Sequence, residues 1–242
     1  MSALLAVSDL TRRFGGLVAV NGVSFEVGRG EVIGLLGPNG SGKTTVLNMI
    51  SGSLRPSGGD VRLNGETLAG RPAYQVARKG IARTFQLVRI LPSLSVAENI
   101  VAALAFRNEP LWGAEARAAA DELLAMVGLG GRGGEQAEDL TYIDQKRMEL
   151  ARALASRPQL LLLDEWLAGL NPTELRVGID LIASLRESGT TIVLVEHVME
   201  AVRALCGRCI VMTAGSKIAD GETSEVLRNP EVVRAYLGDG HA

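Results

Sequence analysis

The sequence predicts an α/β fold with a mostly parallel sheet, an N-terminal antiparallel β edge and an inserted α-helical lobe. Three short apolar runs, nearly continuous and rich in Leu, Ile and Val, predict strands that are covered on both faces. They are VIGLLG at 32–37, LLLLDE at 160–165 and TIVLVEH at 191–197. Strands of this kind are typical of parallel sheets, so these runs are expected to form the core.

The N-terminal part of the chain has a different pattern. From Leu4 to Asp60, and just beyond, apolar and polar residues alternate in segments such as VSFEV and GDVRLNG. Gly-Arg-Gly and Ser-Gly-Gly turns lie between such segments. Alternation bounded by Gly-rich turns indicates antiparallel strands, which we expect at one edge of the molecule.

The middle of the chain predicts helices. Three segments have helical periodicity, and the Gly-rich GLGGRGGEQ at 128–136 predicts a loop between helices. The three segments are VAENIVAALAFR, WGAEARAAADELLAMVGL and MELARALAS. We therefore expect residues 1–85 and 157–242 to form the core with its antiparallel β subdomain, and residues 86–156 to form a helical subdomain.

Composition narrows the classes of function. A chain of 242 residues accommodates one α/β core with an inserted lobe, but not two large domains. Its 25 Lys and Arg against 27 Asp and Glu give a formal charge of −2, which supplies no basic field for nucleic acid. The longest apolar runs are far shorter than the roughly 20 residues of a membrane-spanning helix. The N-terminal MSALLAVSDLTRRFGG does not have the pattern of an export signal, so a cytoplasmic location is expected.

Two cysteines form the pattern CGRC at Cys206 and Cys209. Such a pair can bind a metal or carry out redox chemistry, but the sequence has no second pair, and His197 and His241 are not at ligand spacing. We therefore expect two reduced cysteines at the start of a buried strand.

A glycine-rich motif predicts a phosphate-binding loop. The pattern G-x-x-x-x-G-K-T spans 37–44, directly after an apolar strand and before VLNMISG, which predicts a helix. Glycines let backbone N–H groups turn toward phosphates, Lys43 is expected to reach the β- and γ-phosphates, and the Thr44 hydroxyl is expected to bind Mg²⁺. The residues expected to bind the nucleotide here are Gly37, Asn39, Gly40, Ser41, Gly42, Lys43, Thr44 and Thr45.

An acidic pair ends the second core strand. Buried carboxylates are costly unless they serve a cation or a reaction. We expect Asp164 to hold Mg²⁺ or its water and Glu165 to act as the general base toward the attacking water. Together with the phosphate loop, this pair predicts a nucleoside-triphosphate hydrolase.

Further motifs resemble those of one family. Four segments are similar to segments of ABC-type transport ATPases. They are RTFQ, LTYIDQKRMELARAL just before LLLLDE, AGLNP at 168–172, and the VEH that ends at His197. A narrower resemblance, to the ATPase subunits of branched-chain amino-acid importers, rests on FGGLVAVNGVSFEV, TFQ, DE-x-x-AGLNPTE, VEHVM and NPEVVRAYLG. The resemblance covers essentially the whole chain, with its motifs in order. It implies a RecA-like nucleotide-binding core, a helical subdomain and the cofactors ATP and Mg²⁺.

The resemblance also implies roles for single residues. Phe14 would stack on adenine, although an ordinary core aromatic is the alternative. Gln86 would sense the metal and the attacking water while its loop contacts the membrane partner. His197 would bond the γ-phosphate and position the water, although a lone His can also be a satisfied core residue. Residues 168–171 would form the segment that crosses to a second subunit.

The helix start at Leu140 to Asp144 departs from the family. In ABC ATPases two subunits meet head to tail, and this segment, usually LSGGQ, points its free N–H groups at the partner's ATP. Thr141 keeps a hydroxyl that could reach phosphate, but Ile143 replaces a Gly and Asp144 adds a negative charge. At about 6 Å and an effective dielectric of about 20, that charge would repel phosphate by roughly 2 to 3 kcal/mol.

A second interpretation of the same segment is a helix cap. Thr141 followed by Asp144 three residues later fits a capping box, with Thr141 as the N-cap. If Asp144 points along its own helix, the repulsion falls below about 1 kcal/mol. We favour this interpretation and expect Thr141 to engage the partner's ATP, more weakly than the usual segment would.

Two other departures lie beside the acidic pair and His197. Trp166 stands where the family commonly has Pro, and it could pack against the neighbouring subunit or fill the interface between lobes. Val198 stands where the family often has Asp, and it puts no catalytic role in doubt.

The resemblance implies an ATP-hydrolysing subunit of an ABC importer for branched-chain amino acids or related small polar solutes. Its partners would be integral membrane permease subunits, a second, homologous ATPase subunit that forms a heterodimer with it, and an external solute-binding protein that it meets only indirectly. No nucleic acid is expected. The chain would sit at the cytoplasmic face of the inner membrane, held there by the permease. The alternatives are an exporter ATPase of the lipopolysaccharide type and a soluble, non-transport ABC protein.

Overall fold

The computed structural model describes residues 3–237, so Gly238 of the NPEVVRAYLG segment and His241 lie outside the described residues. Its central sheet has six strands in the order β10-β9-β3-β8-β7-β6. Neighbouring strands are parallel except for β10, which pairs antiparallel with β9. Their bounds are Val32–Leu36 (β3), Ile81–Arg83 (β6), Leu160–Asp164 (β7), Thr191–Val195 (β8), Arg208–Thr213 (β9) and Ser216–Glu222 (β10).

The three apolar runs form β3, β7 and β8, whose residues are all buried, so the predicted mostly parallel sheet is confirmed. Both faces of the sheet are covered. In β7, Leu160 and Leu162 pack into one apolar cluster, and Leu161 and Leu163 pack into the other. A strand with two buried faces has no place for polar side chains, which explains the unbroken apolar run.

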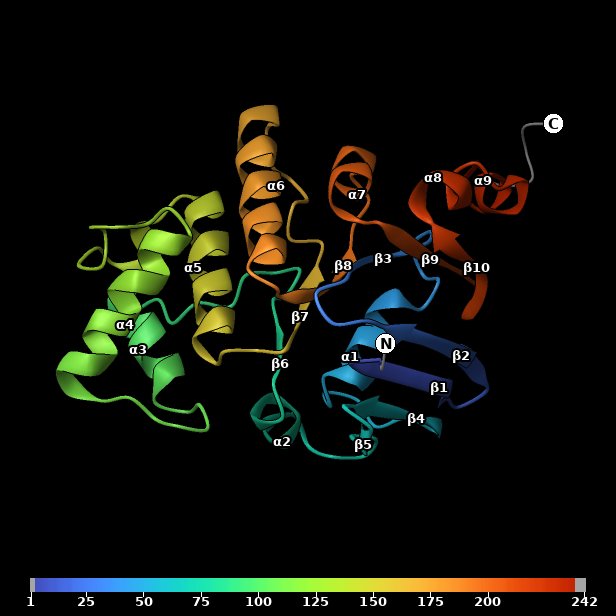
Figure 1. Ribbon diagram of the computed structural model, residues 1–242, viewed down its shortest axis with the longest axis horizontal. Helices are drawn as coiled ribbons and strands as arrows, with labels where there is room; N and C mark the ends of the chain where they lie inside the picture. Colours follow the sequence, from blue (N-terminus) through green and yellow to red (C-terminus); the bar gives the residue numbers. More distant parts are fainter. Residues whose placement is uncertain (1–2, 238–242) are drawn as a thin grey trace.

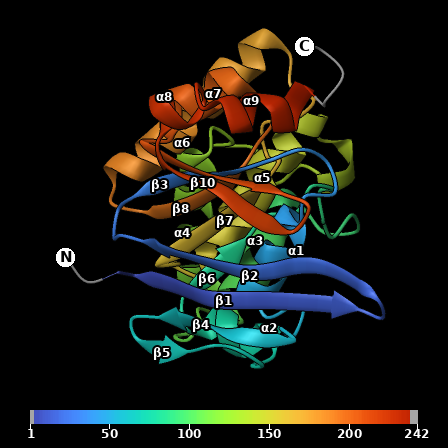
Figure 2. The same cartoon turned by 90° about the vertical axis from the view of Figure 1, so that its right-hand side faces the viewer.

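The second sheet is antiparallel and has the order β2-β1-β4-β5, as expected for the N-terminal part of the chain. Figures 1 and 2 show it on one side of the central sheet, with α1 (Lys43–Ile50) close to both. Val23 of β2, Ile33 of β3 and Leu47 of α1 share one buried cluster. The strands are Leu5–Phe14 (β1), Leu17–Val27 (β2), Gly58–Leu63 (β4) and Glu66–Thr67 (β5).

Helices α3 (Val96–Leu104), α4 (Gly113–Met126) and α5 (Tyr142–Ala155) lie between β6 and β7 in sequence and form a lobe at one end of the molecule (Figure 1). Ile100 of α3 and Leu124 of α4 are buried in this lobe. The division of the chain at residues 86 and 156 stays a prediction. The other helices are α2 (Ala73–Arg78), η1 (Ala137–Asp139), α6 (Pro172–Glu187), α7 (Met199–Leu205), α8 (Thr223–Val226) and α9 (Pro230–Leu237).

Cys206 follows α7 and Cys209 lies in β9; both are buried free thiols, as expected. Among residues 3–237, no helix has the length and apolar character that crossing a bilayer requires.

Candidate active site

The phosphate loop joins β3 to α1, and two of its glycines are required by close contacts. Gly37 and Gly42 have φ angles of 143° and 103°, which disfavour residues with a side chain. A Cβ atom on Gly37 would lie 2.1 Å from the Met212 carbonyl oxygen, and one on Gly42 would lie 2.6 Å from the Ala19 carbonyl oxygen. The loop is therefore packed tightly against β9 and β2, which fixes the direction of its backbone N–H groups.

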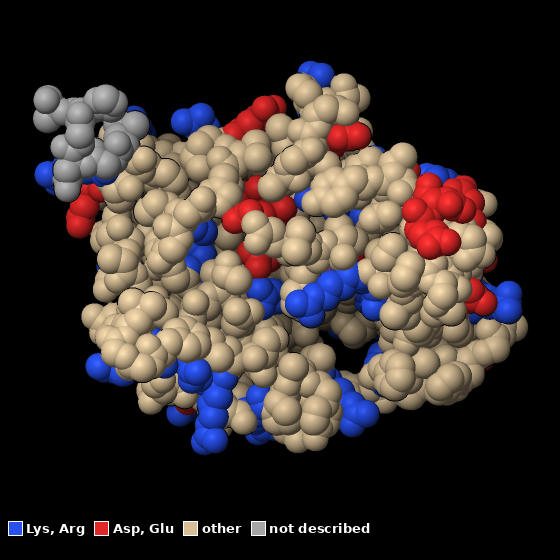
Figure 3. Space-filling view, turned by 180° about the vertical axis from the view of Figure 1, so that it is seen from behind, with Lys and Arg blue, Asp and Glu red and all other residues tan. Residues whose placement is uncertain are grey.

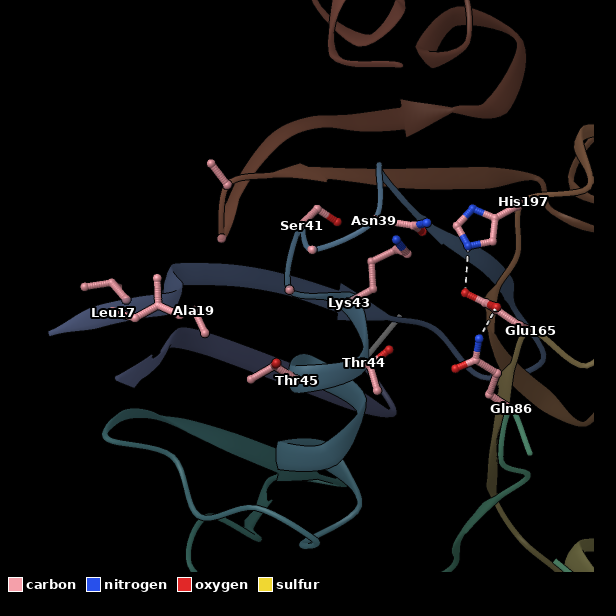
Figure 4. Close-up of a pocket in the computed structure, with 15 residues that line it drawn as sticks. Leu17, Ala19, Asn39, Ser41, Lys43, Thr44, Thr45, Gln86, Glu165 and His197 are labelled. Atoms are coloured by element: carbon pink, nitrogen blue, oxygen red, sulfur yellow. Dashed lines mark hydrogen bonds and ion pairs between the residues drawn. The ribbon is translucent and has the colours of Figure 1, made fainter. Parts of the chain in front are cut away.

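A cleft of about 630 Å³ opens above this loop (Figure 4). It brings together most of the residues predicted for the site, including Gln86, Glu165 and His197 from distant parts of the sequence. Gly37, Asp164, Phe14 and Thr141 do not line it. The lining residues are Leu17, Val18, Ala19, Asn39, Gly40, Ser41, Gly42, Lys43, Thr44, Thr45, Gln86, Glu165, His197, Ala214 and Gly215.

Lys43 is the cation of the cleft. Its Nζ donates to the carbonyl oxygens of Gly37 at 2.7 Å and Pro38 at 3.0 Å. Burial lowers the pKa of Lys43, while the negative charges of Glu165 and Asp164 oppose that shift. The ammonium group thus lies at the phosphate loop, where it can exchange loop carbonyls for phosphate oxygens.

Glu165 accepts hydrogen bonds from both of the other residues predicted to be catalytic. Gln86 Nε2 donates to Glu165 Oε2 at 2.8 Å, and His197 Nε2 lies 2.6 Å from Glu165 Oε1 (Figure 4). The three residues follow β6, β7 and β8, which are parallel neighbours, so their carboxyl ends meet at one edge of the sheet. This network fixes both carboxylate oxygens beside the cleft.

The backbone of Glu165 is strained. Its φ of 52° lies in the left-handed region, which costs a residue with a side chain about 1 to 3 kcal/mol. Its N–H donates to the Val195 carbonyl oxygen at 2.8 Å. A conformation of this kind persists only where surrounding contacts impose it.

Asp164 is buried and ion-paired rather than exposed in the cleft. Its Oδ2 lies 2.7 Å from Arg83 Nη2, and Arg83 Nη1 donates to Asn48 Oδ1 at 2.6 Å. Sequence reasoning did not single out Arg83. The only signal for it is its place in RTFQ, three residues before Gln86.

The oxygen donors near the phosphate loop suit Mg²⁺ bound together with a nucleotide. Thr44 and Gln86 line the cleft, and Arg83 occupies only one oxygen of Asp164. Within residues 3–237, no three His, Cys, Asp or Glu side chains converge as a metal cluster. Mg²⁺ in nucleotide sites keeps several waters and takes most other ligands from phosphates, so a sparse set of protein oxygens fits it.

Phe14 lies at the end of β1, and 45% of its surface is exposed, so it is not a core aromatic. The Arg12 guanidinium stands 4.5 Å from the centroid of its ring. Residues 17–19, which sequence reasoning did not single out, line the cleft instead. The stacking of Phe14 on adenine stays a prediction.

The Asp144 side chain faces its own subunit. Thr141 is the N-cap of α5, since its Oγ1 accepts the Asp144 N–H at 3.4 Å. The Asp144 carboxylate does not complete the predicted capping box, because its Oδ2 accepts the Thr141 hydroxyl at 2.8 Å in place of a free N–H group. Arg132 Nη1 lies 2.7 Å from Oδ2, and Arg147 Nη1 lies 3.0 Å from Oδ1. Burial raises the pKa of Asp144, but hydrogen bonds from Arg132 and Thr141 outweigh it and hold that pKa below its usual value. The carboxylate is therefore neutralised within the chain, and Ile143 is also buried.

Trp166 also belongs to its own subunit. Only 1% of its surface is exposed, and its Nε1 donates to the Lys146 carbonyl oxygen of α5 at 3.1 Å. Of the two interpretations, packing against a neighbouring subunit is wrong. Trp166 fills the interface between the sheet and the helical lobe.

The fold and the site together define a class of protein, a nucleotide-hydrolysing cassette with a phosphate loop and a carboxylate positioned by Gln and His. Residues 20–168 match the ABC transporter family, and residues 216–242 match the family described as branched-chain amino acid ATP-binding cassette transporter. The chain belongs to the ABC transporter family and is one of its ATP-hydrolysing cassettes.

Two curated relatives match along almost their whole length. The high-affinity branched-chain amino acid transport ATP-binding protein LivG of Salmonella typhimurium is 42% identical, with 98% of both chains covered. The corresponding protein BraF of Pseudomonas aeruginosa is 41% identical, with the same coverage.

Two solved structures of ABC cassettes are also similar. The ADP conformation of MJ1267 has a TM-score of 0.89 and 28% identity, covering 99% of this chain and 100% of that one. The dimeric post-hydrolysis structure of MJ0796 with ADP and Pi has a TM-score of 0.81 and 25% identity, covering 90% and 98%.

Proposed function

We propose that this chain hydrolyses ATP to drive import of branched-chain amino acids, or of related small polar solutes, through a membrane permease at the cytoplasmic face of the inner membrane. The names of LivG and BraF and the C-terminal family match support this solute class. No feature of the described chain favours the exporter or the soluble non-transport alternative. The observation that carries hydrolysis is the contact of Gln86 and His197 with Glu165 at the cleft.

The proposed chemistry assigns one task to each group. Glu165 accepts a proton from the attacking water, and its two hydrogen-bonded partners hold it in position for that task. Lys43 neutralises charge on the transferred phosphoryl group. Thr44, Asp164 and Gln86 would hold Mg²⁺, which supplies further neutralisation of phosphate charge when bound.

We infer that the working unit is a head-to-tail dimer with a homologous second ATPase subunit. The solved dimer of MJ0796 supports the dimeric state, and the exposed α5 N-terminus with Thr141 is where the partner's ATP would bind. Because Arg132 and Arg147 neutralise Asp144, this N-terminus keeps its attraction for phosphate. Any weakening of this contact would affect the partner's ATP, because Lys43, Glu165 and His197 line the chain's own cleft.

A groove between α2 and the helical lobe suits a cytoplasmic helix of the permease. A hollow of about 330 Å³ lies beside Phe85 and Arg89 of the Gln86 loop. A neighbouring hollow of about 400 Å³ is lined by four cations and, among the described residues, by no Asp or Glu. Figure 3 shows Lys and Arg atoms around a hollow between the lobe and the rest of the molecule. The four cations are Arg78, Lys79, Arg107 and Arg157.

This surface predicts that the permease segment carries acidic side chains. The double substitution Arg107→Glu and Arg157→Glu should lower co-purification of the permease at least about tenfold, because it places like charges across the contact. Arg228→Glu, beyond the groove near α8, is the matched control. Equal recovery of the permease with the double variant and the control would contradict this docking surface.

Two experiments test the function itself. Uptake of labelled leucine by vesicles that contain the permease, this chain, the second ATPase subunit and the solute-binding protein should require ATP and should stop in the Glu165→Gln variant. Because that variant lacks the proposed general base, it should hold ATP unhydrolysed and should dimerise with a co-expressed second ATPase subunit. A stable ATP-dependent homodimer would contradict the heterodimer, and ATP hydrolysis without uptake of any small amino acid or amide would contradict the importer.

A further inference from the structure

The segment that carries Glu165 is held by a buried lysine from the helical lobe. Lys146 lies in α5, and only 2% of its surface is exposed. Its Nζ donates to the carbonyl oxygens of Trp166 and Ala168, each at 2.8 Å, and of Glu165 at 3.4 Å. Trp166 Nε1 donates back to the Lys146 carbonyl oxygen at 3.1 Å. Four hydrogen bonds therefore join α5 to residues 165–168.

A buried glutamate holds the same segment from the other side. Glu196 lies between β8 and His197, is fully buried, and its Oε1 accepts the Leu167 N–H at 2.6 Å. Among residues 3–237, its Oε2 has no hydrogen-bond partner. Burial raises the pKa of Glu196 to about 7, although hydrogen bonds from the backbone of Leu167 and His197 act to lower it. A buried basic residue and a buried acidic residue, from two different parts of the chain, thus form hydrogen bonds with the backbone of residues 165–168.

These hydrogen bonds would hold the strained backbone conformation of Glu165. A residue with a side chain rarely keeps a φ of 52° unless its neighbours impose it. Neither Lys146 nor Glu196 lines the cleft, so neither is placed to touch ATP or the attacking water. Burying groups that can carry charge costs free energy unless they form hydrogen bonds. Here the hydrogen bonds of both groups go to the backbone segment that orients the Glu165 carboxylate.

We propose that Lys146 and Glu196 are positioning residues for Glu165, and that Lys146 couples α5 to the chain's own hydrolysis site. Thr141 caps the same helix, and Lys146 follows it by little more than one turn. This coupling rests on the proposed head-to-tail dimer. In that dimer, ATP bound by the partner contacts the N-terminus of α5. A shift of α5 then moves the carbonyl groups of Glu165, Trp166 and Ala168 and reorients the Glu165 side chain.

The test compares Lys146→Met with Lys146→Arg in the purified transporter complex. Methionine keeps the length of the apolar stem but donates no hydrogen bond, whereas a guanidinium can still donate to the carbonyls.

In Lys146→Met, kcat should fall about 10- to 100-fold because the general base is misplaced. The affinity for a fluorescent ATP analogue should stay the same because the phosphate loop is intact, and the Hill coefficient for ATP should fall toward one. Lys146→Arg should restore most of kcat.

Several outcomes decide the inference. Lys217→Met, which removes a lysine from an exposed ion pair with Asp220, is the matched control. Glu196→Gln, which keeps an acceptor for the Leu167 N–H, should resemble the wild type, whereas Glu196→Leu should resemble Lys146→Met. An unchanged kcat in Lys146→Met would overturn the positioning role. Equal losses of kcat, ATP affinity and melting temperature in the Met and Arg variants would do the same, because they indicate a structural role.

Failure of the dimer is distinguishable from failure of the coupling. The Glu165→Gln variant reports ATP-dependent dimerisation with the second subunit, independently of Lys146. If that dimer does not form, the proposed assembly is wrong, and the effect of Lys146→Met on kcat still decides the positioning role. If the dimer forms and Lys146→Met keeps the wild-type Hill coefficient, the coupling through α5 is wrong.

Discussion

At the scale of single residues, Asp144 shows how a carboxylate can be accommodated at a helix start that is proposed to face the partner's nucleotide. A carboxylate there competes with phosphate for free N–H groups, and the sequence left its direction open. The structure settles the direction, because Arg132, Arg147 and Thr141 all contact the carboxylate. Thr141 as the cap was predictable, since capping depends on residues three apart. Arg132 was not, because its approach depends on the fold of the preceding loop.

The ion pairs of Asp144 predict a pH dependence of stability. Its pKa is lowered in the folded chain, so its contribution is complete above about pH 4 and is lost as the pH falls through the folded pKa. At pH 7, Asp144→Asn should lower the melting temperature by about 2 to 4 °C, since both pairs are partly exposed. Between pH 4 and pH 2 this difference should shrink. Melting curves of both proteins across this range test the sign, and a difference that grows in acid would contradict it.

At the scale of elements, the ends of the core strands carry the site, and the sequence predicted them well. Continuous apolar runs identify β3, β7 and β8, and parallel pairing then brings Glu165 and His197 to one edge. The contacts between distant elements were beyond the sequence. Lys146 and Glu196 carry no motif that identifies their contacts, and the Arg83–Asp164 pair joins residues 81 positions apart. Such contacts depend on tertiary packing, which no local pattern records.

The C-terminal helix provides another such contact. In α9, the Tyr236 hydroxyl accepts the Gly37 N–H at 2.7 Å, so this helix supports the first glycine of the phosphate loop. Tyr236→Phe should raise the KM for ATP about fivefold, the effect of losing roughly 1 kcal/mol from one hydrogen bond. Tyr74→Phe, on the exposed surface of α2, is the matched control. ATPase assays over a range of ATP concentrations distinguish the two, and an unchanged KM in Tyr236→Phe would contradict the role.

At the scale of the whole molecule, α5 connects the surfaces that transport must coordinate. Its N-terminus carries Thr141, its second turn carries Lys146, and Glu149 contacts the Gln86 loop. Glu149 is buried, and its carboxylate accepts the Arg89 N–H at 3.1 Å and the Phe85 N–H at 3.4 Å. These two residues bracket Gln86 and line the proposed permease groove. One helix therefore contacts the segment of Glu165, the loop of Gln86 and the proposed dimer interface.

This arrangement predicts that Glu149 links hydrolysis to transport. In Glu149→Ala both loop N–H groups lose their acceptor, so the loop can move without moving α5, and the permease loses a rigid contact. Solute transported per ATP hydrolysed should fall about three- to tenfold, with transport falling more than hydrolysis, as expected for a coupling free energy of roughly 1 kcal/mol. Glu149→Gln keeps one oxygen acceptor and should retain most of the wild-type ratio. Parallel measurement of uptake and phosphate release in reconstituted vesicles gives this ratio directly. If Glu149→Ala lowers uptake and hydrolysis in equal proportion, Glu149 serves the hydrolysis site alone, and the connection from α5 to the permease must run through other residues.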